Sequence, residues 1–155
     1  MKKNLIFVIF GIVIGAVVMR NSMQKKVIQV NNMSDKHLAL FLMMNQWTKV
    51  KQRGKKLAAF FEKNGYQKIA VYGMSYAGET LLTELRESEI QVIYGIDRDL
   101  NRVHSDIDMF TMEDSLQKVD AIVVTAITFF EEIAKDLSSK VDCPIISLED
   151  ILYEV

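Results

Sequence analysis

The pattern of hydrophobic and polar positions changes twice along the chain. Residues 5–19, "LIFVIFGIVIGAVVM", are an apolar run without a charged side chain. Residues 27–65 have apolar positions spaced as in helices, and from residue 66 short apolar runs alternate with amphipathic segments. This pattern predicts three parts: a membrane anchor with basic flanks (1–26), a connecting helical segment (27–65) and an α/β domain (66–155).

The apolar run predicts a single-pass transmembrane helix. Its length as a helix is about 22 Å, somewhat short of a hydrocarbon core of roughly 30 Å, so flanking basic side chains would have to snorkel or the bilayer thin. A cleaved signal peptide is the alternative, but no small-x-small cleavage site follows the run. Basic residues after the run outnumber Lys2 and Lys3 before it, which favours a cell-membrane protein with a cytoplasmic C-terminal domain.

Two glycines in the run have the spacing of a helix-dimerisation motif. Gly11 and Gly15 form G-x-x-x-G, where the absence of Cβ atoms lets two helices approach closely. The motif predicts a homo-oligomer through Gly11 and Gly15, although glycine is also common in membrane helices that do not associate in this way.

The connecting segment is predicted to form two helices. The first is expected to be capped by Ser34 and to pack an apolar side on the domain, and the second to end at a left-handed Gly65. The predicted apolar side consists of Leu38, Phe41, Leu42 and Trp47.

From residue 66 onward, strands and helices are predicted to alternate. Helical segments follow the predicted strands, which indicates a Rossmann-like parallel sheet with helices on both faces. Right-handed crossovers place the first strand near the middle of that sheet. The strands are expected at "IAVYG" (69–73), "IQVIYGID" (90–97), "DAIVVTA" (120–126) and "CPIISL" (143–148), with a short edge strand in "DIDMF" (106–110) and a brief helix in "MEDSLQKV" (112–119).

The turn after the first strand carries the strongest chemical signal. The dinucleotide-binding fingerprint has glycines at relative positions one, three and six, occupied here by Gly73, Ser75 and Gly78. An acid is expected after the next strand to bind ribose hydroxyls, and Asp97 stands there. The alternative is a retained turn without a ligand, since the middle glycine is missing and Glu79 would repel an anion.

Four neighbouring residues complete the predicted site. Met74 and Tyr76 lie in the turn, where the Tyr76 ring would either stack on a ligand or pack on the protein. Arg98 would meet an adenine or a second phosphate, which leaves NAD and NADP both open, or would pair with Asp97. Thr125, after the third convincing strand, would offer a hydroxyl across the point where the strand order reverses.

Composition narrows the functional classes. With 155 residues and a formal net charge of −1, the chain does not have the positive charge of a general nucleic-acid binder. The single cysteine, Cys143, has no partnered histidine in sequence, and His37 and His104 lie far apart. We therefore expect no metal site and no cysteine nucleophile.

The segment from Gly54 to Asp99, with "GYQKIAVYG" and "GIDRD", resembles Rossmann-like NAD(P)- or nucleotide-binding domains of bacterial cell-surface polysaccharide biosynthesis proteins. The closing "CPIISLEDIL" is similar to the last strand and helix of those domains. The resemblance implies NAD(P) or a nucleotide sugar as ligand, polysaccharide-biosynthesis enzymes as partners, and Gly73, Ser75, Gly78 and Asp97 as ligand-facing positions. It identifies no reaction and no catalytic residue.

Three functional hypotheses follow. The first is a membrane-anchored nucleotide-binding module accessory to surface-polysaccharide biosynthesis. The second is a scaffold or oligomerisation protein that binds no ligand and uses a degenerate Rossmann fold at the membrane. The third is an enzyme whose substrate-binding half belongs to another chain.

Overall fold

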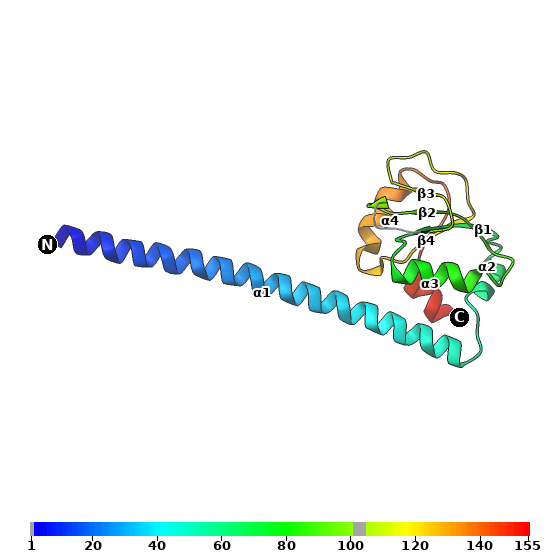
Figure 1. Cartoon of the computed structure of the whole chain (residues 1–155), viewed down its shortest axis with the longest axis horizontal. Helices are drawn as coiled ribbons and strands as arrows, with labels where there is room; N and C mark the ends of the chain where they lie inside the picture. The colour runs from blue at the N-terminus through cyan, green and yellow to red at the C-terminus, as the bar shows by residue number, and fades with distance from the viewer. Residues whose placement is uncertain (1, 101–104) are drawn as a thin grey trace. The chain divides into compact units, whose positions relative to one another are not determined.

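The computed structural model describes residues 2–100 and 105–155; between residues 2 and 22, side chains are described at Met19 and Arg20 only. The chain forms two compact units, one ending at Leu38 and one from Ala39 to Val155. Helix α1 (Lys2–Gln52) provides the whole described part of the first unit and the opening turns of the second (Figure 1). The predicted helix start at Ser34 is wrong, because α1 is continuous through that residue.

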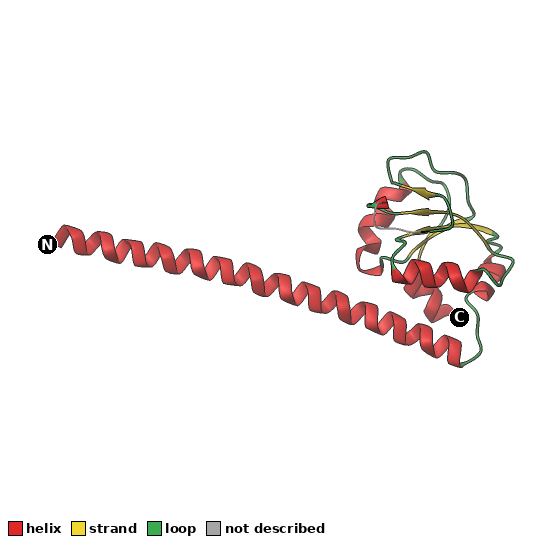
Figure 2. Cartoon of the chain, viewed as in Figure 1, coloured by secondary structure: helices red, strands yellow, loops and turns green. Residues whose placement is uncertain are grey.

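The second unit is built on a five-stranded parallel sheet with the order β3-β2-β1-β4-β5 (Figure 2). This arrangement confirms the predicted parallel α/β fold, places β1 in the middle and shows the short edge strand in 106–110. It is consistent with a Rossmann-like fold. The strands are β1 (Lys68–Tyr72), β2 (Gln91–Ile96), β3 (Met109–Phe110), β4 (Ala121–Val124) and β5 (Ile145–Ser147).

Helices cover both faces of the sheet, because the central strands are apolar on both sides. Ile69 and Val71 of β1 face one core, and Ala70 and Tyr72 face the other. The first core is covered by the last turns of α1 and by α2 (Ala58–Asn64), α3 (Tyr76–Leu85) and α5 (Leu148–Glu154). The second is covered by α4 (Phe130–Ser138), which follows the short 3-10 helix η2 (Ile127–Phe129), and by the segment between β3 and β4 (Figure 1).

The last turns of α1 pack on the domain through a different face from the one predicted. The buried side chains are Met43, Trp47 and Val50, at i, i+4 and i+7. Trp47 was part of the predicted face, but Phe41 and Leu42 are exposed. The apolar residues of this segment nearly encircle the helix, so periodicity alone did not select the side that meets the sheet.

The segment 112–119 is not helical, contrary to the prediction. The amide and hydroxyl groups of Thr111 both donate to Asp114 Oδ2, at 2.7 and 2.8 Å, and form a turn that competes with a helix. Downstream, the buried hydroxyl of Tyr94 donates to the Gln117 carbonyl at 2.8 Å. Burial raises the pKa of Tyr94 to about 12, so the hydroxyl stays protonated and donates this hydrogen bond over the whole physiological pH range. The extended chain is thus held on the sheet by specific bonds.

The helix α2 ends as predicted. Gly65 follows it with φ of 73°, the left-handed conformation expected of a glycine C-cap. The predicted membrane span at residues 5–19, with Gly11 and Gly15, lies outside the residues with described side chains except for Met19. Within the part of the chain that the structure describes, no helix has the length and apolar character needed to cross a membrane.

Glu84 on α3 joins three segments of the second unit. Its carboxylate accepts hydrogen bonds from Trp47 Nε1 at 2.7 Å and from the Leu57 amide at 3.0 Å, and Lys51 Nζ lies 3.0 Å away. Burial alone would raise the pKa of Glu84, but these three donors together outweigh it and hold the pKa below its ordinary value of 4.5. The ionised carboxylate therefore stabilises the docking of α1 and α2 on α3.

Replacing Glu84 by Gln should destabilise the protein by about 1–3 kcal/mol at pH 7, because Gln retains the shape but loses the charge on which the three donors converge. Since the folded-state pKa is depressed, the contribution is complete above pH 4.5 and disappears as the pH falls through the folded-state value. Urea unfolding at pH 7 and at a series of pH values below 4.5 measures both effects. Glu87→Gln, an exposed acid on the turn that follows α3, is the matched control. A difference between wild type and Glu84→Gln that is independent of pH would contradict this account.

Candidate functional site

The candidate site lies at the carboxyl end of β1. The chain leaves β1 towards β2 on one side, and β4 pairs with β1 on the other, so the strand order reverses at this point. In open parallel sheets, ligands bind at such a switch point, beyond the carboxyl ends of the strands. The predicted site residues follow β1, β2 and β4, and the topology therefore brings them to one edge of the sheet.

Two glycines allow the turn after β1 to pass close to its neighbours. Gly73 has φ of +93°, and a Cβ there would lie 2.7 Å from Thr125 Oγ1. A Cβ on Gly78 would lie 2.3 Å from the Gly73 carbonyl oxygen. The helix α3 thus starts directly against the end of β1. Gly73 makes the tight turn and Gly78 allows the close helix–strand packing that the first and third glycines provide in the dinucleotide fingerprint.

The start of α3 is open towards solvent. Ser75 is the exposed N-cap residue, with extended backbone, and its side chain makes no capping hydrogen bond. Tyr76 is 88% exposed and Glu79 is exposed as well, so neither side chain fills the turn. The first amide groups of α3 therefore have no side-chain cap, as an anion-binding helix start requires.

Asp97 is held against this turn by two backbone amides. One carboxylate oxygen accepts from Met74 N at 3.0 Å and the other from Asp99 N at 3.2 Å. The predicted neighbours Gly73, Met74 and Asp97 are therefore brought together. A carboxylate oxygen accepts more than one hydrogen bond, so both oxygens retain capacity for donors such as the hydroxyls of a ribose.

Two of the predicted residues support the turn from inside the protein. Thr125 is buried, and its hydroxyl donates to the carbonyl of Gly73, with the Tyr72 carbonyl 3.2 Å away. The side chain of Met74 is also buried and contacts the positions of Gly78 and Gly95. Met74 thus contributes an amide group to the site, and Thr125 fixes the loop that carries it.

Arg98 connects the two sides of the switch point. It follows β2, yet its Nη2 lies 2.9 Å from Oε1 of Glu132 in the first turn of α4, which follows β4. The Glu132 carboxylate raises the pKa of Arg98 above its ordinary value, and the hydroxyl of Tyr72 at the end of β1 adds a smaller effect in the same direction. The guanidinium group therefore lies across the carboxyl end of β1, with 60% of both paired side chains exposed.

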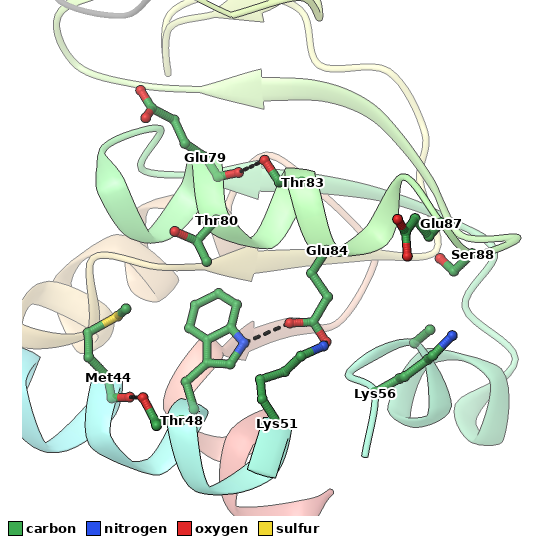
Figure 3. A pocket seen from close by; sticks show the side chains of 12 residues that line it. Met44, Thr48, Lys51, Lys56, Glu79, Thr80, Thr83, Glu84, Glu87 and Ser88 are labelled. Atoms are coloured by element: carbon green, nitrogen blue, oxygen red, sulfur yellow. Dashed lines mark hydrogen bonds and ion pairs between the residues drawn. The ribbon is translucent and has the colours of Figure 1, made fainter. Parts of the chain in front are cut away.

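A separate cavity of about 710 Å³ lies between the last turns of α1 and α3 (Figure 3). The Glu84 carboxylate in its wall is already bonded to Trp47 Nε1, the Leu57 amide and Lys51 Nζ. Its remaining polar wall includes Thr80 and Thr83, whose hydroxyls donate to carbonyls of their own helix. Its other charged lining residues are Lys56, Glu79 and Glu87, so three acids are set against two lysines and the cavity does not favour an anionic ligand.

Other reactive groups do not assemble a second centre. Burial, with Asp120 and Asp142 nearby, raises the pKa of the Cys143 thiol and disfavours the nucleophilic thiolate. Among residues 2–100 and 105–155, no group of three or more histidine, cysteine or acidic side chains is placed to hold a metal ion. No protein-family model, curated protein or solved structure matches the chain.

Sequence reasoning missed two side-chain contacts. Glu132 occupies an amphipathic helix, and nothing in its local sequence indicates that Arg98, far upstream, would reach it. Trp47 was expected to pack on the domain, but its bond to Glu84 was not foreseen, because an indole donor in an apolar stripe gives no sign of its acceptor. Parallel-sheet topology is the signal that could have paired the segments after β2 and β4.

Gly78→Ala should destabilise the protein by about 1–3 kcal/mol, despite the higher helix propensity of alanine, because the new methyl group would force α3 away from Gly73. Chemical denaturation measures the loss. Thr80→Ala, at an exposed position on the same helix, should change stability by no more than about 0.5 kcal/mol. A Gly78→Ala protein as stable as the Thr80→Ala control would show that the close approach of helix and strand is not required.

Proposed function

We propose that the second unit is a nucleotide-binding module for a ligand that contains a ribose and a diphosphate, such as NAD(P) or a nucleotide sugar. The observation that carries this proposal is the Asp97 carboxylate, fixed by the Met74 amide beside an uncapped helix start at the switch point of the sheet. Anion-binding amides and a ribose-binding acid thus lie next to each other, as ligands of this kind require.

Each residue has a defined task in the proposed complex. The diphosphate would lie against the turn at Gly73 and the first amides of α3, with the exposed hydroxyl of Ser75 as an additional donor. The ribose hydroxyls would donate to Asp97. Arg98 would exchange the carboxylate of Glu132 for a phosphate oxygen, because a guanidinium group binds both planar acids and phosphates.

We further propose that the chain is anchored in the cell membrane through residues 5–19 and acts beside enzymes of surface-polysaccharide biosynthesis, with the second unit in the cytoplasm. The support for the anchor is the apolar run with its basic flanks, and the support for the pathway is the resemblance carried by "GYQKIAVYG", "GIDRD" and "CPIISLEDIL". No side chain is assigned a catalytic task.

The proposal predicts opposite effects of two acidic residues on ligand affinity. Asp97→Asn should weaken the binding of a ribose diphosphate about tenfold, because the charged acceptor of the ribose hydroxyls is lost. Glu132→Gln should strengthen binding about two- to fivefold, since Arg98 no longer has to leave an exposed ion pair. Calorimetry of full-length protein in detergent with ADP, NAD, NADP and UDP-glucose measures both changes.

Glu131→Gln is the matched control, because it removes one acid from the same turn of α4 at an exposed position. Its affinity should equal that of the wild type. Folded protein that binds none of the four ligands at millimolar concentration would exclude the proposed ligand role.

A second candidate function is a scaffold that associates through α1. It is favoured by the large apolar side chains that α1 exposes between Met19 and Met44. The two functions are compatible, because the exposed apolar residues and the switch point involve different segments of the chain.

A further inference from the structure

The first unit carries an apolar strip that it cannot bury by itself. Its described part consists of α1 only, and a single helix has no second element on which to pack an apolar face. Five large apolar side chains between residues 23 and 38 are 51 to 60% exposed and lie along one strip: Met23, Val27, Val30, Met33 and Leu38. Of the described residues in this stretch, Ile28 is the exposed large apolar side chain that lies off the strip.

Three residues of the strip, together with two polar residues, have the spacing of a two-stranded coiled coil. Met23, Val27, Val30, Ser34 and His37 follow one another by four, three, four and three residues, which we define as the seam. In the sequence, the same spacing continues downstream through Phe41, Met44 and Thr48, and upstream through Arg20, Ala16, Val13 and Ile9, so the charged Arg20 also stands on this line. A four-three alternation in which most positions are apolar, as they are here, is typical of helices that supercoil around each other.

The residues beside the seam fit a second copy of the same helix. In a parallel pair, the residues that precede Val27 and Ser34 on one copy each face the residue five places further along the other copy. This rule places Met33 opposite Leu38 and Lys26 opposite Asn31, so one flanking pair is apolar and the other has no like-charge contact. The opposite side of the helix has polar residues, including Lys25 and Asn32. The seam and the residues that flank it therefore fit a second, parallel copy of the same helix.

We propose that residues 23–37 form a parallel two-stranded coiled coil between two copies of this chain. The interface buries the seam and the Met33–Leu38 flanks. Ser34 and His37 are the polar seam positions, and such positions set register and strand number at some expense of stability. This interface is distinct from the Gly11 and Gly15 contact expected inside the apolar run, and it does not depend on nucleotide binding.

Single-cysteine cross-linking of the full-length protein tests the proposal. In a Cys143→Ser background, which removes the only cysteine, Val27→Cys and Val30→Cys place a thiol on the seam, and Lys25→Cys and Asn32→Cys place one on the opposite side. Equivalent seam residues of a parallel pair lie near enough for a disulfide. Mild oxidation in detergent micelles, followed by non-reducing electrophoresis, should give at least five times more covalent dimer from the two seam variants than from the two controls.

Two outcomes would overturn the proposal. Seam variants that cross-link no better than the controls would mean that a lipid surface or another protein covers the strip, or that nothing does. Loss of seam cross-linking in a Gly11→Leu/Gly15→Leu version would show that association belongs to the apolar run. Cross-linking that persists in that version, but is lost when Val30→Lys is combined with Val27→Cys, would support the coiled coil.

Discussion

The approach of α3 to the end of β1 is the constraint on which the second unit depends. The Gly73 carbonyl occupies the space that a side chain at position 78 would need, and the Gly73 Cα leaves room for Thr125. This contact directs the first amides of α3 to the edge of the sheet and sets the direction of the whole helix. Glu84 lies on the third turn of that helix, so the docking of α1 and α2 through Glu84 follows from the same contact.

Aspartates bound by backbone amides occur at both ends of the strands, but their surroundings give them different tasks. Asp120, before β4, accepts from the amides of Gln67 and Lys68 at 2.8 and 2.7 Å, and these bonds lower its pKa. It ties the start of β1 to the start of β4. Asp97 accepts amides in the same way, but at the carboxyl edge, beside an uncapped helix. Position in the parallel sheet, and not the type of residue, makes Asp97 the candidate for ligand binding.

Sequence patterns predicted the sheet well because each strand and helix is determined by residues that are close together in the sequence. Short apolar runs separated by amphipathic helices determine a parallel sheet, and the crossover rule places β1 in the middle. The same local logic located the Gly73 turn and Asp97. It failed where a choice between distant partners decides the outcome. The face of α1 that packs through Met43 and Val50, and the pairing of Arg98 with Glu132, depend on which segments meet after folding.

The failure at 112–119 has a different cause. The amphipathic spacing there favours a helix, but Thr111 and Asp114 satisfy their polar groups within a turn, and Tyr94 binds the extended chain at Gln117. A few side-chain bonds thus replace the hydrogen bonds that a short helix would provide. Since isolated helices of such length have little stability of their own, this competition is decided by contacts that local sequence does not reveal.

The ion pair at the switch point is too weak to exclude a ligand. Both Arg98 and Glu132 are 60% exposed, and exposed ion pairs contribute at most about 1 kcal/mol, or less than a tenfold effect on an equilibrium. A diphosphate brings more negative charge than one carboxylate, so the proposed ligand would compete with Glu132 on favourable terms. The pair therefore defines the position of Arg98. It holds a cation close to Tyr72 at the end of β1, where the proposed function requires one.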